Sequence, residues 1–300
     1  MNLKIRRYIK FYYGIFALFC AVIALSFITS QFRSVTVNAI TYSEFVKKNI
    51  KDVPEFTIPK FVFRTAKFKI DNLPAQVRNI LMTTMRNSPE YIQVYLDDDE
   101  HIQFIREEFP EYLNAYLSII PGAYKADIVR LLLIYRYGGI YNDIGNKYLK
   151  PIHQYVNDND ELVLTKDHIQ SGQFSICNGF IGAYKKHPII KSMIDLVMYN
   201  VDNRRYGDNY LDIAGPNAIG RAFNRFFDKE DFSEFRDGVF TIPKESQTYK
   251  IKVFYRDGRF IKLNGAKFIR YKFSKYSKIM YENTKIPHYA EYWNNRNVYQ

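Results

Sequence analysis

The chain has 300 residues, of which 47% are hydrophobic and 17% aromatic, so it can bury a core of catalytic-domain size. Its formal net charge of +12 suits an anionic partner: a nucleoside diphosphate, an anionic membrane surface or a nucleic acid. Its two cysteines, Cys20 and Cys177, exclude a disulfide framework.

The N-terminus has the pattern of a membrane anchor. Residues 1–10 form a basic tail, and residues 11–30 are uncharged and mostly apolar. About 20 apolar residues cross a bilayer as a helix, and a preceding positive cluster stays in the cytosol. A cleaved signal peptide is the alternative, but its apolar core is usually about 7–15 residues long. We therefore expect an uncleaved signal-anchor of a single-pass type II membrane protein, followed by a stem at residues 31–55.

From residue 56 onward, apolar strand patterns alternate with helical ones. After residue 239 the pattern changes to short strands separated by Asp257-Gly258 and Asn264-Gly265, which are hairpin signals. Alternating strands and helices predict a three-layer α/β domain with a mostly parallel central sheet. The expected strands are 60–65, 91–96, 140–141, 161–165 and 180–184, and the expected helices are 72–86, 99–109, 122–137, 187–200 and 216–227.

The stretch 122–151 contains the strongest candidate site. Asp127 and Arg130 are three residues apart, so they share one face of the predicted helix. Gly138-Gly139 should end that helix, and Asp143 follows the short apolar strand after it. Ligands bind at strand ends in open α/β sheets, which favours a ligand site here. An ordinary surface ion pair is the simpler interpretation of Asp127 and Arg130.

The run from Ala126 to Asp143 reads A-D-I-V-R-L-L-L-I-Y-x-x-G-G-I-Y-x-D and resembles the DXD-containing sugar transferases of glycosyltransferase family 32. Further matching blocks occur in the family's order over residues 56–295, which a chance motif would not produce. These blocks are Ile58–Thr65, Asp97–Pro110, Asn178–Ala183, Gly215-Pro216, and His288 with Trp293. The resemblance implies a GT-A-type, Rossmann-like fold and a nucleotide-sugar-dependent hexosyltransferase that retains the anomeric configuration.

The resemblance also implies roles for individual residues. Asp127 and Arg130 would bind the hydroxyls of the donor sugar, and Asp143 would be the first Asp of the D-x-D motif, which meets the metal and the ribose. These three form the expected catalytic set. The remaining expected donor-binding residues are Phe63, Arg64 and Thr65, which would border the base, together with Asn178 and Trp293.

The sequence departs from the family pattern at Gly145, where the second Asp of D-x-D is expected. Hard divalent ions such as Mn²⁺ prefer carboxylate oxygens, so this loss should weaken the metal site. Asn146 or His288 could complete the ligands around Asp143; alternatively, Lys147 could replace the charge of the metal. We expect a divalent cation, Mn²⁺, as the cofactor, and we expect Gly145 to leave space for a second ligand.

Two charged segments have simpler interpretations. Asp97-Asp98-Asp99 could mimic a D-x-D motif, but aspartate is favoured where a helix starts. The segment 244–285 carries twelve Lys and Arg residues against three acidic ones, with aromatic residues between them. Such a stretch can bind nucleic acid or form a solvated face. A lumenal domain argues against nucleic acid and favours an anionic acceptor or the bilayer.

These patterns together predict a membrane-anchored glycosyltransferase whose catalytic domain spans residues 56–300. It would transfer a hexose from a nucleotide sugar to a glycan or glycolipid acceptor. In a eukaryotic cell the domain would lie in the lumen of the endoplasmic reticulum or Golgi, without a nucleic-acid partner. The alternative is a sugar- or nucleotide-binding relative that lost catalysis together with the second Asp.

Overall fold

The computed structural model describes residues 39–48, 53–167, 174–230, 232, 236–281 and 286–300. The expected tail and signal-anchor, residues 1–30, lie outside the described residues. Within the described part, none of the helices is both long and apolar enough to cross a membrane.

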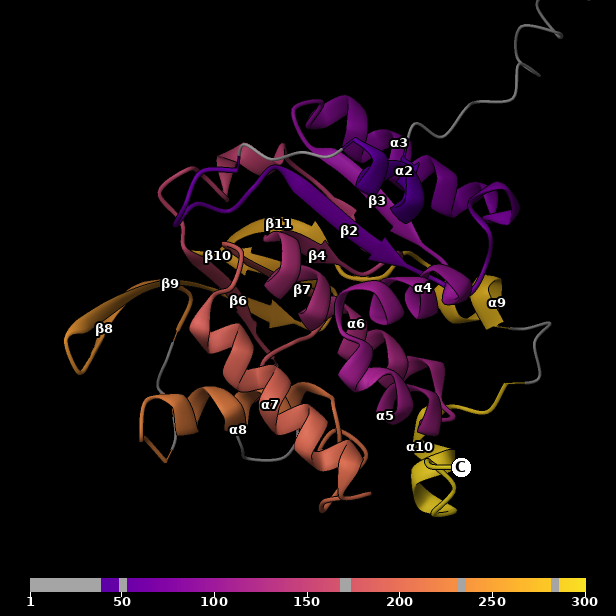
Figure 1. The fold of residues 1–300 in the computed structure, drawn as a ribbon. Coiled ribbons are helices and arrows are strands. Elements are labelled where there is room, and N and C mark those ends of the chain that lie inside the picture. Colours follow the sequence, from indigo (N-terminus) through magenta and orange to yellow (C-terminus); the bar gives the residue numbers. More distant parts are fainter. Residues whose placement is uncertain (1–38, 49–52, 168–173, 231, 233–235, 282–285) are drawn as a thin grey trace, which may run out of the picture. The chain divides into compact units, whose positions relative to one another are not determined.

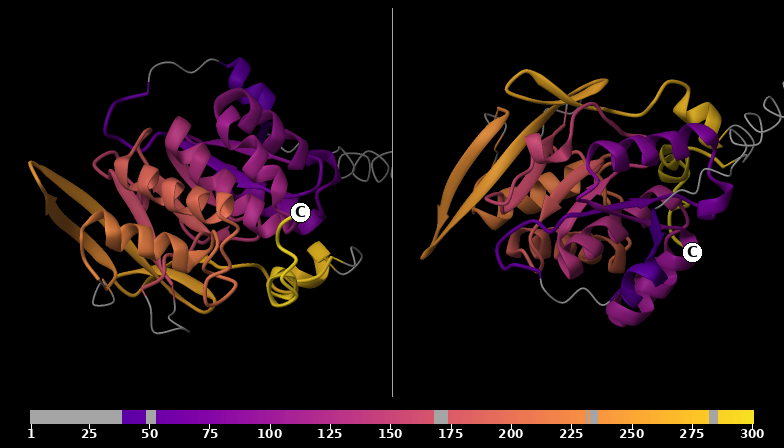
Figure 2. Two further views of the ribbon diagram at one scale, coloured as in Figure 1. Left: turned by 60° about the horizontal axis from the view of Figure 1, so that its bottom comes forward. Right: turned by 90° about the horizontal axis from the view of Figure 1, so that it is seen from above.

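The described residues form one sheet of eleven strands (Figure 1). The strand order is β1-β3-β2-β4-β7-β6-β9-β10-β11-β5, and β8 pairs with β9 beside this path. The β8–β9 hairpin extends beyond the other strands (Figures 1 and 2). The strands are β1 (Ile40–Thr41), β2 (Phe61–Thr65), β3 (Ile92–Leu96), β4 (Gly139–Asn142), β5 (Lys147–Tyr148), β6 (Leu162–Lys166), β7 (Phe180–Ala183), β8 (Gly238–Lys244), β9 (Gln247–Asp257), β10 (Phe260–Leu263) and β11 (Ala266–Arg270).

The sheet is mixed, so the prediction of a mostly parallel sheet is wrong. Parallel pairing joins β1 to β3, β2 to β3 and β4, and β6 to β9. The remaining pairs are antiparallel, including β4 with β7 and the β8–β9–β10–β11 meander. Strands joined by tight turns must run antiparallel, and the turn signals at Asp257-Gly258 and Asn264-Gly265 lie in this meander.

Alternation along the strands gives the sheet two apolar faces. On β2, Phe61 and Phe63 pack into the larger core with the helices, whereas Val62 packs into a second core with residues of β5, β10 and β11. Arg64 shares the face of Val62, and its bond to Thr84 of α3 places that helix on the second face. The helices are α2 (Tyr42–Lys47), α3 (Ala75–Asn87), α4 (Asp98–Glu108), α5 (Leu113–Ser118), α6 (Gly122–Tyr137), α7 (Pro188–Asp202), α8 (Pro216–Phe226), α9 (Tyr276–Tyr281) and α10 (Tyr289–Asn294), with short 3-10 turns at Ile70–Asn72, Pro110–Tyr112 and Ile152–Gln154.

The folded unit begins earlier than residue 56, within the segment expected to be a stem. Strand β1 pairs with β3, and Tyr42 and Phe45 of α2 are buried in the larger core. The Thr41 side chain caps α2 in a capping box with Glu44. Residues 40–47 are therefore part of the folded unit, and their burial depends on contacts with strands that are distant in the sequence.

The aspartates at the end of β3 cap a helix, as the sequence predicted. Asp97 Oδ1 accepts hydrogen bonds of 3.0 Å from the backbone N–H groups of both Asp99 and Glu100 at the start of α4. This carboxylate satisfies N–H groups that have no partner inside the helix. The triple aspartate is therefore a structural feature of the α4 terminus.

Candidate active site

Two glycines turn the chain from α6 into β4 and so place Asp143 at the end of a central strand. Gly138 and Gly139 have φ angles of +68° and +101°, which side chains rarely tolerate. A Cβ atom on Gly139 would also lie 2.9 Å from the carbonyl oxygen of Phe61. Strand β4 therefore lies close against β2, and Asp143 follows directly at its end.

The Arg130 guanidinium joins the two predicted catalytic carboxylates. Its Nη2 lies 3.2 Å from Asp127 Oδ1, and its Nη1 lies 3.6 Å from Asp143 Oδ1. The guanidinium also lies over the Tyr141 ring, 4.5 Å from the centroid. The sequence placed Asp127 and Arg130 on one helix face, and the fold adds Asp143 to the same cluster.

Burial sets the electrostatics of this cluster. Burial raises the pKa of Asp127 to about 6, although Arg130 and the Asn178 amide act to lower it. For Arg130, burial opposes the charge, but Tyr141 and the two aspartates outweigh it and keep its pKa above the usual value. At neutral pH Asp127 is therefore mostly ionised, and it has hydrogen-bond capacity left for a ligand.

Arg64 fixes the loop that follows β4 from the protein interior. Its Nη1 donates to the carbonyl oxygens of Asp143 at 2.9 Å and Asn146 at 3.1 Å, and only 1% of Arg64 is exposed. Phe63 lies in the core, and the Thr65 hydroxyl bonds the Tyr141 hydroxyl at 3.0 Å. The residues expected to border the base thus lie inside the domain, where Arg64 supports the loop.

The residues after Cys177 form the other wall of the cluster. Asn178 is buried; its Nδ2 donates to the Ala214 carbonyl at 3.1 Å, while its Oδ1 has no hydrogen-bond partner among the described residues. Gly179 accepts the Asp143 N–H at 2.9 Å. A Cβ atom at Gly179 would lie 2.8 Å from Asp143 Oδ2 and 2.9 Å from Tyr271 Cε2, so this glycine lets both side chains approach.

A C-terminal strap, residues 271–276, crosses the loop 143–146. The backbone N–H of Lys272 donates to Asn146 Oδ1 at 3.0 Å, and that of Phe273 donates to the Gly145 carbonyl at 3.0 Å. A Cβ atom at Gly145 would lie 2.5 Å from the Tyr276 ring. The expectation that Gly145 leaves open space is therefore wrong, because Tyr276 fills it. No local pattern in the sequence indicates this contact.

The residues predicted to hold a divalent cation do not form a ligand set. Asn146 is 0% exposed; its Nδ2 donates to the Gly179 carbonyl and its Oδ1 accepts from the strap. The Nδ1 atom of His288 accepts the Ala290 N–H at the start of α10. In the part of the chain that the structure describes, no group of three or more His, Cys, Asp or Glu side chains could hold a metal. Among the described residues, neither Asn146 nor His288 is therefore placed beside Asp143 as a second ligand of the kind that Mn²⁺ prefers.

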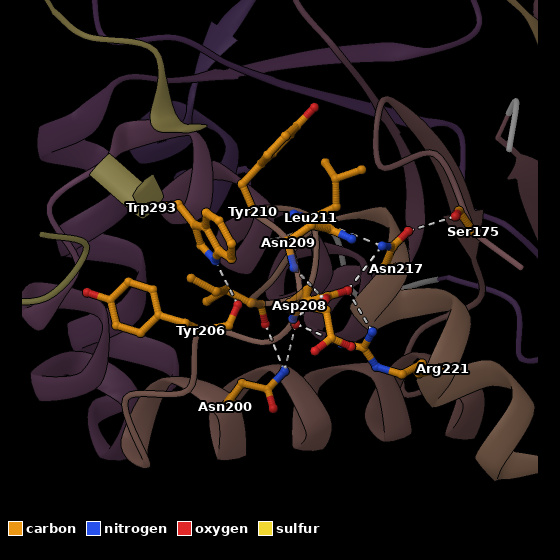
Figure 3. Close-up of polar contacts among 12 residues, drawn as sticks. Ser175, Asn200, Tyr206, Asp208, Asn209, Tyr210, Leu211, Asn217, Arg221 and Trp293 are labelled. Carbon is orange, nitrogen blue, oxygen red and sulfur yellow. Dashed lines mark hydrogen bonds and ion pairs between the residues drawn. The ribbon is translucent and has the colours of Figure 1, made fainter. Parts of the chain in front are cut away.

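The loop between α7 and α8 supports the site through a polar network (Figure 3). Asp212 bonds Arg221 and Asn217, and the Asn200 side chain donates to the carbonyls of Asp212 and Ile213. Trp293 Nε1 donates to the Tyr206 carbonyl at 2.8 Å, as Figure 3 shows. Trp293 is thereby tied to this loop, from which Ala214 reaches Asn178.

Acidic partners neutralise part of the basic segment 244–285. Ion pairs join Lys244 to Asp228, Lys252 to Asp160, Arg256 to Asp167 and Lys262 to Asp257. These four pairs account for part of the excess charge of the segment.

A family model covers the residues of the cluster. Residues 74–167, which include Asp127, Arg130 and Asp143, match the model of the family described as a glycosyltransferase sugar-binding region containing a DXD motif. A solved structure titled PaToxG Glycosyltransferase is 20% identical, with a TM-score of 0.45, covering 57% of this chain and 70% of that chain.

Fungal proteins are similar to parts of the chain. The initiation-specific alpha-1,6-mannosyltransferase of Candida albicans is 24% identical over 191 residues, 55% of this chain and 49% of that protein. Its Saccharomyces cerevisiae counterpart is 34% identical over 109 residues, 34% and 22% of the two chains. Inositol phosphoceramide mannosyltransferase 3 of Schizosaccharomyces pombe is 28% identical over 140 residues, 46% and 36% of the two chains. The matches span half or less of these relatives. The family match over residues 74–167 and these similarities confirm the resemblance seen in the sequence, to glycosyltransferases whose sugar-binding region contains the DXD motif.

Proposed function

We propose that this protein is a GT-A-type hexosyltransferase that moves a sugar from a nucleoside diphosphate donor to a glycan or glycolipid acceptor. The observation that carries the proposal is the Arg130 guanidinium, which bridges Asp127 and Asp143 at the end of β4 inside the matched family region. The named mannosyltransferase activities of the relatives support a hexose, and mannose is the first candidate.

The proposed roles follow from the chemistry of the cluster. Asp127, ionised above pH about 6, accepts hydrogen bonds from donor-sugar hydroxyls, and Arg130 donates to the same sugar. Asp143, held by Arg130 and by the Gly179 carbonyl, lies where it can accept from the ribose. In the transfer, the acceptor oxygen bonds to the anomeric carbon, the bond from that carbon to the diphosphate oxygen breaks, and the acceptor hydroxyl releases its proton. We also propose retention at the anomeric carbon, which the family resemblance implies.

Donor hydrolysis and transfer by the full-length chain test this proposal. The donors are GDP-mannose, UDP-glucose and UDP-galactose, each with and without Mn²⁺. We expect one donor to be hydrolysed by the wild type and much more slowly by Asp143→Asn. Asp195→Asn, at an exposed position on α7, is the control and should keep wild-type rates. Nucleotide binding without turnover of any donor would favour the alternative, a binding relative that has lost catalysis.

We propose further that the chain is a type II membrane protein. The basis is the basic tail at residues 1–10 followed by the uncharged apolar run at residues 11–30. Protease protection in sealed microsomes measures the topology. The C-terminal domain should resist digestion until detergent is added; its digestion in intact vesicles would contradict the proposal.

A further inference from the structure

Tyr276 occupies the position where a D-x-D motif would carry its second carboxylate. Both Cδ2 and Cε2 of the ring lie 2.5 Å from the Cβ position of Gly145. Gly145 has no positive φ angle, so its lack of a side chain serves the close approach of the ring. The Tyr276 ring of the strap thus fills the space that the second carboxylate would occupy.

The same strap places one ammonium group beside the cluster. Lys272 Nζ lies 5.3 Å from the Tyr271 ring centroid and 5.4 Å from that of Tyr276. Tyr271 packs beside Asp143 against Gly179, and Tyr276 packs against Gly145. The Tyr276 ring therefore lies on the D-x-G loop, and the Tyr271 ring lies on the adjacent Gly179. The Lys272 side chain, flanked by both rings, is exposed.

The backbone of Lys272 is held in an unfavourable conformation. Its φ is +49°, in the left-handed region that a lysine enters only at a cost. The bond from its N–H to Asn146 Oδ1 fixes this conformation to the loop. The pKa of Asp127 is raised by burial, and the charge of Lys272 offsets part of this rise. Geometry and electrostatics both place Lys272 at the predicted donor site.

The local charge balance explains why a lysine suits this position. A second aspartate together with a bound divalent ion adds one net positive charge to a donor site. A glycine together with one lysine adds the same net charge. A departing diphosphate needs such positive charge close to its oxygens. The carboxylates cannot supply it, and Arg130 is already shared between Asp127 and Asp143.

Building on the proposed function, we propose that Lys272 binds the donor diphosphate directly and takes the place of the divalent ion that a second aspartate would hold. Nucleoside diphosphate binding is then independent of metal. Lys147, the candidate that the sequence suggested for this role, lies on β5 beside Arg270 of β11, and the described residues show no bond from its side chain to Asp127 or Asp143.

Calorimetric binding of GDP and UDP to the full-length chain, in EDTA and then in Mn²⁺, tests the proposal. The wild type should bind one of the two nucleotides in EDTA, with little gain from Mn²⁺. Lys272→Met, which keeps the length of the side chain without its charge, should weaken binding roughly tenfold or more, whereas Lys272→Arg should retain most of it. Melting temperatures of both variants check that the fold is kept.

Lys275→Met is the matched control, because Lys275 is also an exposed lysine of the strap with a positive φ, +62°. It should bind like the wild type, and so should Lys147→Met. Binding that requires Mn²⁺ and is unaffected by Lys272→Met would overturn this inference and leave the proposed function standing. A loss with Lys147→Met in place of Lys272→Met would overturn it as well. Failure to bind either nucleotide in any condition, with no donor turnover, would overturn both proposals.

Discussion

Two of the aspartate–arginine clusters in the described part of the chain, around Asp212 and around Arg130, differ in how completely their carboxylates are satisfied. Around Asp212, Oδ1 accepts from Arg221 at 2.7 Å and from Asn217 at 3.0 Å, and Oδ2 accepts two backbone N–H groups at 2.7 and 3.0 Å. In the Arg130 cluster, one guanidinium is shared by Asp127 at 3.2 Å and Asp143 at 3.6 Å.

The pKa directions express the same difference. Burial raises the pKa of Asp212, but its bonds to Arg221 and Asn217 outweigh burial and lower it overall. Burial wins at Asp127 and raises its pKa to about 6. A carboxylate with four donors is a structural element of its loop, whereas one that is buried with too few donors is prepared for a ligand that brings more. Variants of Asp212, Asp127 and Arg130 test this distinction.

The largest expected effect is on stability. Asp212→Ala removes the acceptor of four hydrogen bonds and leaves buried amides unpaired, so it should lower the free energy of unfolding by about 3 kcal/mol. Thermal unfolding measures this loss, and Asp127→Ala, at the incompletely satisfied cluster, is the comparison. An equal fall in melting temperature for both variants would remove the distinction between the clusters.

The second effect is on catalysis. Asp127→Asn and Arg130→Ala should each slow sugar transfer by roughly ten- to a hundredfold, because each removes a charge-assisted hydrogen bond to the donor sugar. Both proteins should remain folded, as judged by circular dichroism. Steady-state kinetics with the donor that the wild type hydrolyses gives the rates. Wild-type kinetics in both variants would exclude these residues from the donor site.

The third effect is a pH dependence of opposite sign at the two clusters. With a folded-state pKa of about 6 against the ordinary 3.8 of an aspartate, Asp127 contributes stability at low pH that is lost as pH rises through about 6. The wild type should therefore lose on the order of 2 kcal/mol relative to Asp127→Asn between pH 4 and pH 7. For Asp212, whose pKa is lowered, the stability relative to Asp212→Asn should be lost as pH falls. Urea unfolding measures both, between pH 4 and pH 7 for Asp127 and below about pH 4 for Asp212. The same sign at both positions would be a contradiction.

The smallest effect concerns the packing of the strap. Gly145→Ala brings a Cβ atom within 2.5 Å of the Tyr276 ring, so the ring must shift, at a cost of about 1 kcal/mol. In a Tyr276→Ala background the same substitution should cost little, and a double-mutant cycle of unfolding free energies isolates the coupling. For the same reason Gly145→Asp alone should not create a metal site. Additive effects of the two alanine substitutions would show that the ring does not limit this position.

Much of the local structure could be predicted from the sequence. Helical spacing, the glycine pair and the short apolar run located α6, β4 and Asp143, and the three aspartates after β3 marked the start of α4. The direction of β7 could not be predicted in the same way. Whether β7 runs parallel or antiparallel to β4 depends on the end of the sheet at which the chain enters it again. Residue alternation does not encode that choice.

The sequence by itself determined the helix that carries Asp127 and Arg130, its glycine end and the position of Asp143 after a strand. These features depend on side-chain periodicity and backbone preference over a few neighbouring residues. Only the tertiary structure decided that Arg130 reaches Asp143, that Asn146 is buried, and that Lys272 and Tyr276 lie on the D-x-G loop. The strap is separated from that loop by more than a hundred residues, and packing of the intervening strands, which no local pattern records, brings the two together.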